Sequence, residues 1–133
     1  ARLRRGALTD KALELSCNKI AYAHNSDDVV ETMMLSLLFE GRFYCFSPIT
    51  YLDESDLTLI RPLMYVEERE VIGFKNLMSL PVAKNPCPAD GFTKREDMKK
   101  LVAQLNFNYK GAKTRMFTAI LDGNIEGWPK KVR

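Results

Sequence analysis

Apolar residues recur along the chain at both helical and strand spacing, which predicts an alternation of the two elements. Residues 2–16, 30–38 and 67–79 repeat apolar positions every three or four residues, as one buried face of a helix does. Short apolar runs at 20–23 and 57–60 have the length of buried strands, and residues 43–46 form an aromatic run that Pro48 ends. The acidic turn at 53–56 predicts a hairpin or a pair of edge strands around it.

The last third of the chain predicts two further helices, at residues 94–106 and 112–122, with basic faces turned outward. The fold class expected is α/β: the second half of an open parallel sheet with flanking helices, ending in a small helical lobe. We expect one domain over residues 1–133, with an α/β part at 1–91 and C-terminal helices at 92–133. The basic helical faces are either solvated or in contact with a nucleic acid.

The turn after the first predicted strand is crowded with polar groups. It contains His24, Asn25, Ser26, Asp27 and Asp28, and an amphipathic helix ending at Gly41 follows. In open α/β sheets ligands bind at the carboxyl ends of strands, where this turn lies. Asn25 or Ser26 can cap the helix, and the two aspartates then sit where the helix dipole favours negative charge. These residues alone therefore allow either a ligand site or simply a well-capped helix.

Four other residues allow a functional interpretation as well as a structural one. Arg4 and Arg5 lie at a helix N-terminus, where cations oppose the dipole, so they are either solvated or bound to an anion. Arg61 leaves a strand at its carboxyl end, and the following proline keeps its backbone extended. Cys87 lies between Pro86 and Pro88 in a stiff loop, as a small packing residue or as a ligand.

Composition narrows the class of protein without choosing a function. The 133 residues are 46% hydrophobic and 28% charged, with a net charge of +3 that permits a nucleic-acid partner but does not demand one. No apolar stretch has the length of a membrane span, and no signal-peptide pattern opens the chain. Three widely spaced cysteines suggest reduced thiols and a cytoplasmic location. Cys17 and Cys45 are expected to be packing residues.

Several of these features together resemble one known superfamily. Residues 23–32 resemble the Gly-His-His-x-Asp-Asp motif of the PP-loop ATP pyrophosphatases, in the branch that makes 2-thiocytidine in tRNA. The likeness continues at residues 3–6, 60–63 and 86–88 and so covers nearly the whole chain. Ala23 replaces the glycine of the motif and Asn25 its second histidine. The resemblance implies an adenine nucleotide alpha hydrolase-like fold.

The resemblance also implies an activity and a set of ligands. Such an enzyme uses ATP and Mg²⁺ to adenylate a base carbonyl of cytidine in tRNA, releases pyrophosphate, and replaces AMP with sulfur. It implies catalytic roles for His24, Asp27 and Asp28, and ATP or tRNA binding by Arg4, Arg5, Asn25 and Arg61. Because the carboxyl ends of neighbouring strands lie together, we expect His24, Asp27 and Asp28 to line one cleft with Arg61. Cys87 would be one ligand of a [4Fe-4S] cluster, with two more cysteines from a Cys-x-x-Cys upstream. The partners expected are tRNA, a sulfur donor and, as an open alternative, a second copy of the chain.

These residues include neither an initiator Met nor a glycine-rich phosphate loop, which leads us to expect the C-terminal part of a larger protein. Alone, the chain is then expected to be inactive in adenylation and to expose a strand edge or an apolar patch. Two rival functions remain: another PP-loop enzyme of the lysidine-forming type, which uses an amine and no cluster, and a non-catalytic or tRNA-binding module. Cys87 discriminates against the first, because an amine-using enzyme has no need of that thiol.

Overall fold

The computed structural model describes residues 2–83, 93–123, 125 and 128, with side chains from Arg5 onward. Its elements, in chain order, are α1 (Arg2–Glu14), β1 (Lys19–Ala21), α2 (Ser26–Leu35), a π-helical turn η1 (Ser36–Glu40), β2 (Ile49–Leu52), β3 (Leu57–Ile60), α3 (Glu68–Leu77), α4 (Lys94–Asn108) and α5 (Ala112–Asp122). Gly41 ends η1 in the left-handed conformation that favours glycine, as predicted.

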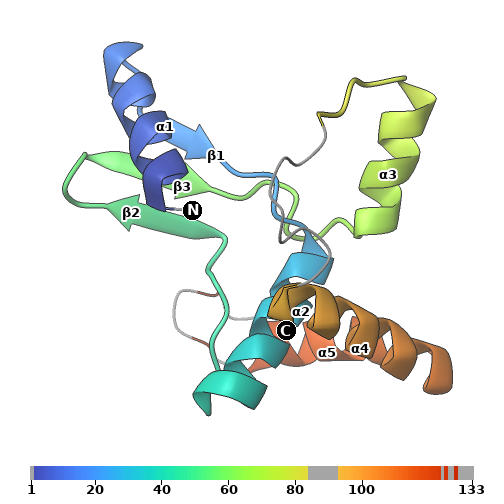
Figure 1. Cartoon of the computed structure of the whole chain (residues 1–133). Coiled ribbons are helices and arrows are strands. Elements are labelled where there is room, and N and C mark those ends of the chain that lie inside the picture. Colours follow the sequence, from blue (N-terminus) through green and yellow to red (C-terminus); the bar gives the residue numbers. More distant parts are fainter. Residues whose placement is uncertain (1, 84–92, 124, 126–127, 129–133) are drawn as a thin grey trace.

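The sheet has three strands in the order β1-β3-β2. β1 and β3 pair in parallel, with Ile20 opposite Leu59, whereas β2 and β3 form the predicted hairpin and are antiparallel. The sheet is therefore mixed and not wholly parallel, because the turn at 53–56 is too short for the crossover that a parallel pair needs. α1 lies over the sheet (Figure 1), and Ala12 packs there with Ile20, Leu57 and Leu59. The predicted α/β class is confirmed.

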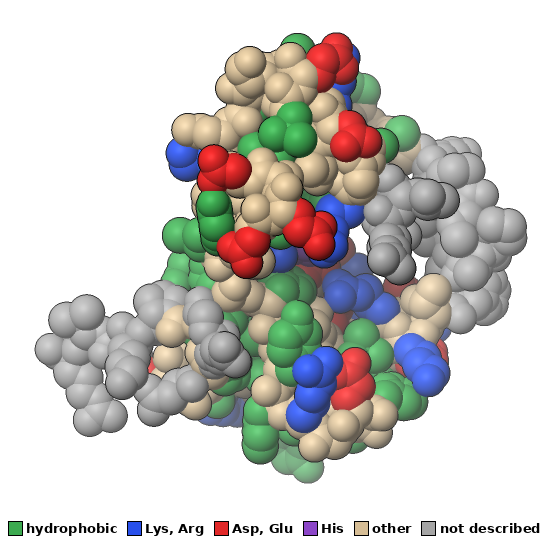
Figure 2. Space-filling model, turned by 90° about the vertical axis from the view of Figure 1, so that its left-hand side faces the viewer, with side chains coloured by type: hydrophobic (Ala, Val, Ile, Leu, Met, Phe, Trp, Pro, Cys, Tyr) green, Lys and Arg blue, Asp and Glu red, His purple; other side chains and the backbone are tan. Residues whose placement is uncertain are grey.

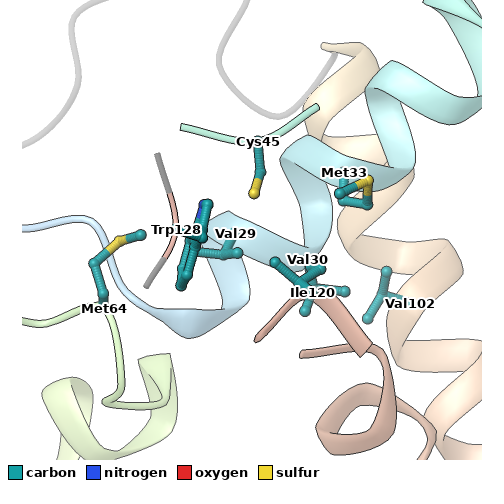
Figure 3. Packing of buried hydrophobic residues seen from close by; sticks show 8 residues of the cluster. All are labelled: Val29, Val30, Met33, Cys45, Met64, Val102, Ile120 and Trp128. Atoms are coloured by element: carbon teal, nitrogen blue, oxygen red, sulfur yellow. The ribbon is translucent and has the colours of Figure 1, made fainter. Parts of the chain in front are cut away.

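A larger core lies around α2, away from the sheet. Figure 3 shows its buried members converging from α2, α4, α5 and the loops: Val29, Val30, Met33, Cys45, Met64, Val102, Ile120 and Trp128. Val30 and Met33 of the predicted apolar stripe are thus buried and pack against α4 and α5 more than against strands, whereas Leu37 and Leu38, in η1, are exposed. The two C-terminal helices share a core with the element that directly follows β1, so they fix the position of the polar turn at 24–28.

Residues 43–46 do not form the predicted strand. Phe43 is 78% exposed and Cys45 is 2% exposed, so the segment buries one residue but offers no continuous ladder. Two of the backbone carbonyls here bond to side chains: the Trp128 indole donates to the Phe46 carbonyl at 3.1 Å, and Arg61 donates to the Ser47 carbonyl. The strand begins only at Ile49, after Pro48.

Two predicted apolar faces are exposed instead of buried. In α1, Ala12 is buried, whereas Leu8 and Leu13 are exposed, as is Leu15 just after the helix; only the side of the helix near Ala12 meets the sheet. α3 stands apart from the other elements (Figure 1), and none of its residues is buried. Figure 2 shows hydrophobic side chains lying between charged ones on one face of the molecule. Both β1 and β2 are edge strands, so the expected exposed edges and apolar patches are present.

No helix within the described ranges has the length and apolarity needed to cross a membrane.

Candidate functional site

The polar turn at 24–28 is a well-made helix start. Asn25 is the N-cap: its side-chain oxygen accepts from the Asp28 backbone N–H at 3.1 Å, and the Asp28 carboxylate accepts from the Asn25 backbone N–H at 2.9 Å. This reciprocal pair satisfies two backbone donors that a helix end would otherwise leave open. Ser26 is not the cap, because its hydroxyl and its backbone N–H both donate to the Val66 carbonyl. These bonds tie the turn to the segment that precedes α3.

Both aspartates are engaged by cations from the C-terminal helices. Asp27 accepts from Lys113 Nζ at 2.6 Å and from the Glu68 backbone N–H at 2.8 Å. Asp28 accepts from the Arg95 guanidinium at 3.0 Å, and the same guanidinium donates to the Thr32 hydroxyl. The prediction that the basic residues of α4 and α5 face outward is therefore wrong for Arg95 and Lys113. These two residues turn inward because the carboxylates on α2 need partners where water is partly excluded.

The ion pair of Lys113 and Asp27 is the more buried of the two. Their side chains are 22% and 13% exposed, against 43% and 26% for Arg95 and Asp28. Although burial alone would lower the pKa of Lys113, the hydrogen bond and charge of Asp27, helped by Glu67, raise it instead. Lys113 therefore stays protonated, and its charge neutralises Asp27 within the fold.

The described residues do not fit a magnesium site at this turn. Among them, no group of three or more His, Cys, Asp or Glu side chains is arranged to hold a metal ion. Both aspartates already accept from a cation and a backbone N–H, so the oxygen lone pairs that Mg²⁺ would require are largely occupied.

His24 and Arg61 lie side by side, as the shared-cleft hypothesis requires. Arg61 Nε donates to His24 Nδ1 at 3.3 Å, and its terminal nitrogen donates to the Ser47 carbonyl and to the Thr50 hydroxyl at 3.1 Å. Because Nδ1 accepts, the neutral ring carries its proton on Nε2. Burial lowers the pKa of His24; the Asp28 charge opposes this shift, and Arg61 and Arg95 add to it. His24 is accordingly a neutral imidazole near pH 7.

A groove of about 710 Å³ passes along this arginine, and we call it the arginine groove. Arg5, Arg42 and Arg61 line it, together with the aromatic segment that contains Tyr44 and Phe46. The Arg61 guanidinium lies 5.0 Å from the centre of the Phe46 ring, and Arg42 lies 4.5 Å from that of Tyr44. Three guanidinium groups and stacked aromatic rings in one groove suit a ligand that combines phosphates with a base.

The candidate residues do not all line one groove. It brings Arg5 to the arginine groove with Arg61, and His24 to Arg61, whereas Asp27 lines a separate groove between α2, α4 and α5. The expectation of a single cleft is thus not met for Asp27. The backbone of Arg4 belongs to α1, but its side chain lies outside the described ones.

The cysteines separate by environment. Cys45 is buried, and burial raises the pKa of its thiol to about 11, so it packs as predicted and is unsuited to thiolate ligation. Cys17 is exposed, contrary to the prediction that it packs, because it follows the end of α1 where the chain turns toward β1. Cys87 lies outside the described residues. The described residues therefore contain no ligand set for an iron–sulfur cluster.

Comparison with known proteins shows which proteins this chain is related to. No protein-family profile matches it. It is 40% identical over 128 residues to a tRNA-cytidine(32) 2-sulfurtransferase from Geobacter sulfurreducens and 38% identical over 128 residues to one from Syntrophotalea carbinolica. Each alignment covers 95% of this chain and 49% of the relative. The resemblance predicted from the sequence is confirmed. The chain is a relative of the tRNA-thiolating PP-loop proteins.

A solved structure supports the same conclusion. A U34-tRNA thiolase, NcsA, from Methanococcus maripaludis, determined with its [4Fe-4S] cluster, superposes with a TM-score of 0.67 and 25% identity. The match covers 94% of this chain and 43% of that one. The chain thus spans about half the length of the thiolation proteins it matches.

The sequence analysis did not identify several residues of the candidate site in this relative of the tRNA thiolases. Arg42 and Tyr44 border the arginine groove, and Arg95 and Lys113 hold the aspartates. A weak signal existed for the last two, since two adjacent carboxylates at the start of a helix imply cations nearby. Nothing in the spacing could say that these cations come from 67 and 86 residues further along the chain.

The ion pair between Asp27 and Lys113 yields a stability prediction. Lys113→Met should lower the free energy of unfolding by about 2 kcal/mol, because it leaves the mostly buried Asp27 carboxylate with one backbone donor. This loss is smaller than that expected for a fully buried ion pair, since both side chains are partly exposed. Chemical denaturation monitored by circular dichroism measures the change.

Lys110→Met is the matched control, since Lys110 is exposed and forms no ion pair within the described residues. The double variant Asp27→Asn, Lys113→Met should recover part of the loss, because it removes the stranded charge. Equal stabilities for Lys113→Met and the control would show that the pair contributes nothing.

Proposed function

We propose that the natural gene product containing this chain is an ATP-dependent tRNA sulfurtransferase. It adenylates a base carbonyl of cytidine in tRNA, with release of pyrophosphate, and then replaces AMP with sulfur. The observation that carries this proposal is the 40% identity to a tRNA-cytidine(32) 2-sulfurtransferase across 95% of the chain. A sulfur donor and a second copy of the chain are the further partners we propose, in the cytoplasm.

The arginine groove supports the proposal on chemical grounds. ATP and tRNA are both polyphosphate or phosphodiester anions that carry aromatic bases. Arg5 and Arg61 can bind such phosphates through guanidinium donors, and the exposed Tyr44 ring offers a surface to a base. We assign ATP or tRNA binding to this groove.

Arg61 is the residue best placed to act on developing charge. Its side chain is held by the Ser47 carbonyl, the Thr50 hydroxyl and His24 Nδ1, so its orientation is set before any ligand arrives. Negative charge grows on phosphate oxygens as the adenylate forms and again as AMP leaves. A fixed guanidinium beside those oxygens stabilises both transition states. His24, neutral and protonated on Nε2, can add a hydrogen-bond donor without adding charge.

We propose that Asp27 and Asp28 act by positioning. Asp28 caps α2 together with Asn25 and holds Arg95, and Asp27 binds Lys113 and the start of α3. Their loss would displace the turn that carries His24. No magnesium-dependent step is derived for these residues, because their oxygens are already bonded in the fold.

The proposed activity can be tested by analysing tRNA nucleosides. The natural gene product is expressed in a bacterial strain whose tRNA lacks 2-thiocytidine, and the digested tRNA is examined by mass spectrometry. The proposal expects 2-thiocytidine to appear only in cells that make the protein. A soluble, folded protein that leaves the nucleoside absent, or a lysidine-type modification in its place, would count against the proposal.

A further inference from the structure

The groove between α2, α4 and α5 is a second polar site that the arginine groove does not include. It has a volume of about 590 Å³ and is lined by residues that include Asp27, Glu31, Lys99, Phe107, Lys110 and Lys113. With Glu68, its other carboxylate, it contains three acidic and three basic side chains. Formal charges therefore balance, so the groove as a whole selects neither a strong cation nor a strong anion.

Glu31 is the unusual member of this groove. It projects from α2 and is 6% exposed, yet within the described part of the chain no hydrogen bond or ion pair joins its carboxylate to another residue. The neighbouring cations are taken: Lys99 lies 2.7 Å from Glu68, Lys113 lies 2.6 Å from Asp27, and Arg95 lies 3.0 Å from Asp28. No fully buried side-chain oxygen among the described residues lacks a partner, so the Glu31 oxygens keep contact with the groove and can accept from a donor that enters it.

The electrostatics agree with that geometry. The pKa of Glu31 is raised to about 7: burial is the largest cause, the Asp28 and Glu68 charges add to the rise, and Lys99 and Arg95 oppose it. The titratable and charged groups that face it are, by element, Asp27 and Asp28 on α2, Glu68 on α3, Arg95 and Lys99 on α4, Lys110 on the link to α5, and Lys113 on α5. The carboxylate is mostly ionised above this pH and protonated below it.

Two residues at the rim of this groove, Phe107 and Lys110, have the other properties needed to hold a nucleotide. Phe107, near the end of α4, is 85% exposed, and it borders the same groove as Glu31. Lys110 follows it and has no ion-pair partner among the described residues. An exposed ring, a buried acceptor and a free cation are what single-stranded RNA recognition uses for stacking, for reading a base edge and for binding phosphate.

We propose that this groove holds one unpaired nucleotide of an RNA, with its base stacked on Phe107, an exocyclic amino group donating to Glu31, and a phosphate at Lys110. The inference rests on the proposed function for the presence of RNA, and it adds a second point of contact. A base that carries an amino group, such as cytosine, donates to a carboxylate through that group, whereas uracil presents an oxygen at the same position. A neutral base suits the balanced charge of the groove, because it adds no net charge beside the three carboxylates and three lysines.

The test compares two fluorescent RNA pentanucleotides, one of cytidines and one of uridines. Their affinities for the natural gene product are measured by anisotropy, without ATP, at pH 8 and at pH 6. We expect roughly a five- to tenfold preference for cytidine at pH 8, where Glu31 is ionised. The preference should shrink at pH 6, because a protonated carboxyl can donate to the uracil oxygen.

Variants separate the contributions. Glu31→Gln should abolish the preference at both pH values, and Phe107→Ala should weaken binding of both RNAs about fivefold or more, because a stacked base is lost. Phe74→Ala is the matched control, since Phe74 is an exposed phenylalanine on α3, away from the groove. It should change neither affinity, and circular dichroism should show every variant folded.

Equal affinities of the wild-type protein for the two RNAs at pH 8, or full binding by Phe107→Ala, would overturn the inference. An arginine-rich peptide that binds the wild type but not Glu31→Gln would point to a protein partner and would overturn it as well. These readouts involve no thiolation, so they are independent of the 2-thiocytidine assay. RNA bound through the arginine groove alone, without base preference, would remove the second contact and leave the proposed function standing.

Discussion

Replacing Cys87 with serine in the natural gene product is expected to abolish its visible iron–sulfur absorbance. The expectation follows from the resemblance to tRNA-thiolating proteins, one relative of which carries a [4Fe-4S] cluster. Serine keeps the size of the side chain but has no thiolate, and thiolates are the ligands that hold such clusters. Purification without oxygen, followed by absorption spectra and iron analysis, gives the result directly.

The structure provides the controls for this experiment. Cys17 is exposed at the end of α1 and Cys45 is buried in the core, with a pKa raised by burial to about 11. Cys17→Ser and Cys45→Ser should therefore both retain the cluster; the second should show reduced stability, since it places a hydroxyl in an apolar core. A full cluster in Cys87→Ser would remove the assignment of Cys87 as a ligand, and a wild-type protein without any cluster would favour an enzyme that uses an amine.

Arg61→Ala should lower the rate of tRNA thiolation by roughly 10²- to 10³-fold, the loss typical when a preorganised donor to a developing anion is removed. If Arg61 acts in the transition state, the reduction will appear in kcat more than in the KM for ATP or tRNA. Arg61→Lys should restore only part of the rate, because one ammonium cannot reproduce three fixed contacts to Ser47, Thr50 and His24.

An arginine on the surface, Arg69, provides the matched control for Arg61→Ala. Arg69 lies on α3 with a side chain 79% exposed, and its contact is an ion pair to Glu67. Arg69→Ala should leave the rate unchanged. Thermal unfolding of Arg61→Ala must be measured as well, since the Ser47 carbonyl loses a donor. If the protein is folded and its rate is within twofold of wild type, Arg61 has no catalytic part.

Local patterns in the sequence were sufficient for several elements. The helix predicted at 112–122 has those bounds, the acidic turn at 53–56 joins β2 and β3, and Gly41 ends its helix in the left-handed region. Each of these depends on residues near one another in the chain: an apolar repeat, a turn or a glycine. Such signals need no knowledge of what packs where.

The failures all concern what a local pattern meets in space. The apolar repeat of α3 is as regular as that of α2. The apolar face of α3 is nevertheless exposed, whereas Val29, Val30 and Met33 of α2 are buried, because α4 and α5 pack on α2 and not on α3. The aromatic residues 43–46 looked like a strand, but the Trp128 indole and Arg61 bond to the carbonyls of Phe46 and Ser47. Nothing near Asp27 in the sequence indicated that Lys113 forms an ion pair with it. Partners that are distant in sequence cannot be read from periodicity.

The burial of α2 by α5 has a consequence for the newly made chain. Val29 and Ile120 belong to the same core cluster, and Ile120 is added about 90 residues after Val29. At ribosomal speeds of roughly 5–20 residues per second, that is a delay of about 5–20 s. Throughout this interval the apolar stripe of α2 has no α5 to cover it. A nascent chain with such a stripe is a natural client for a chaperone that holds apolar segments until synthesis passes residue 122.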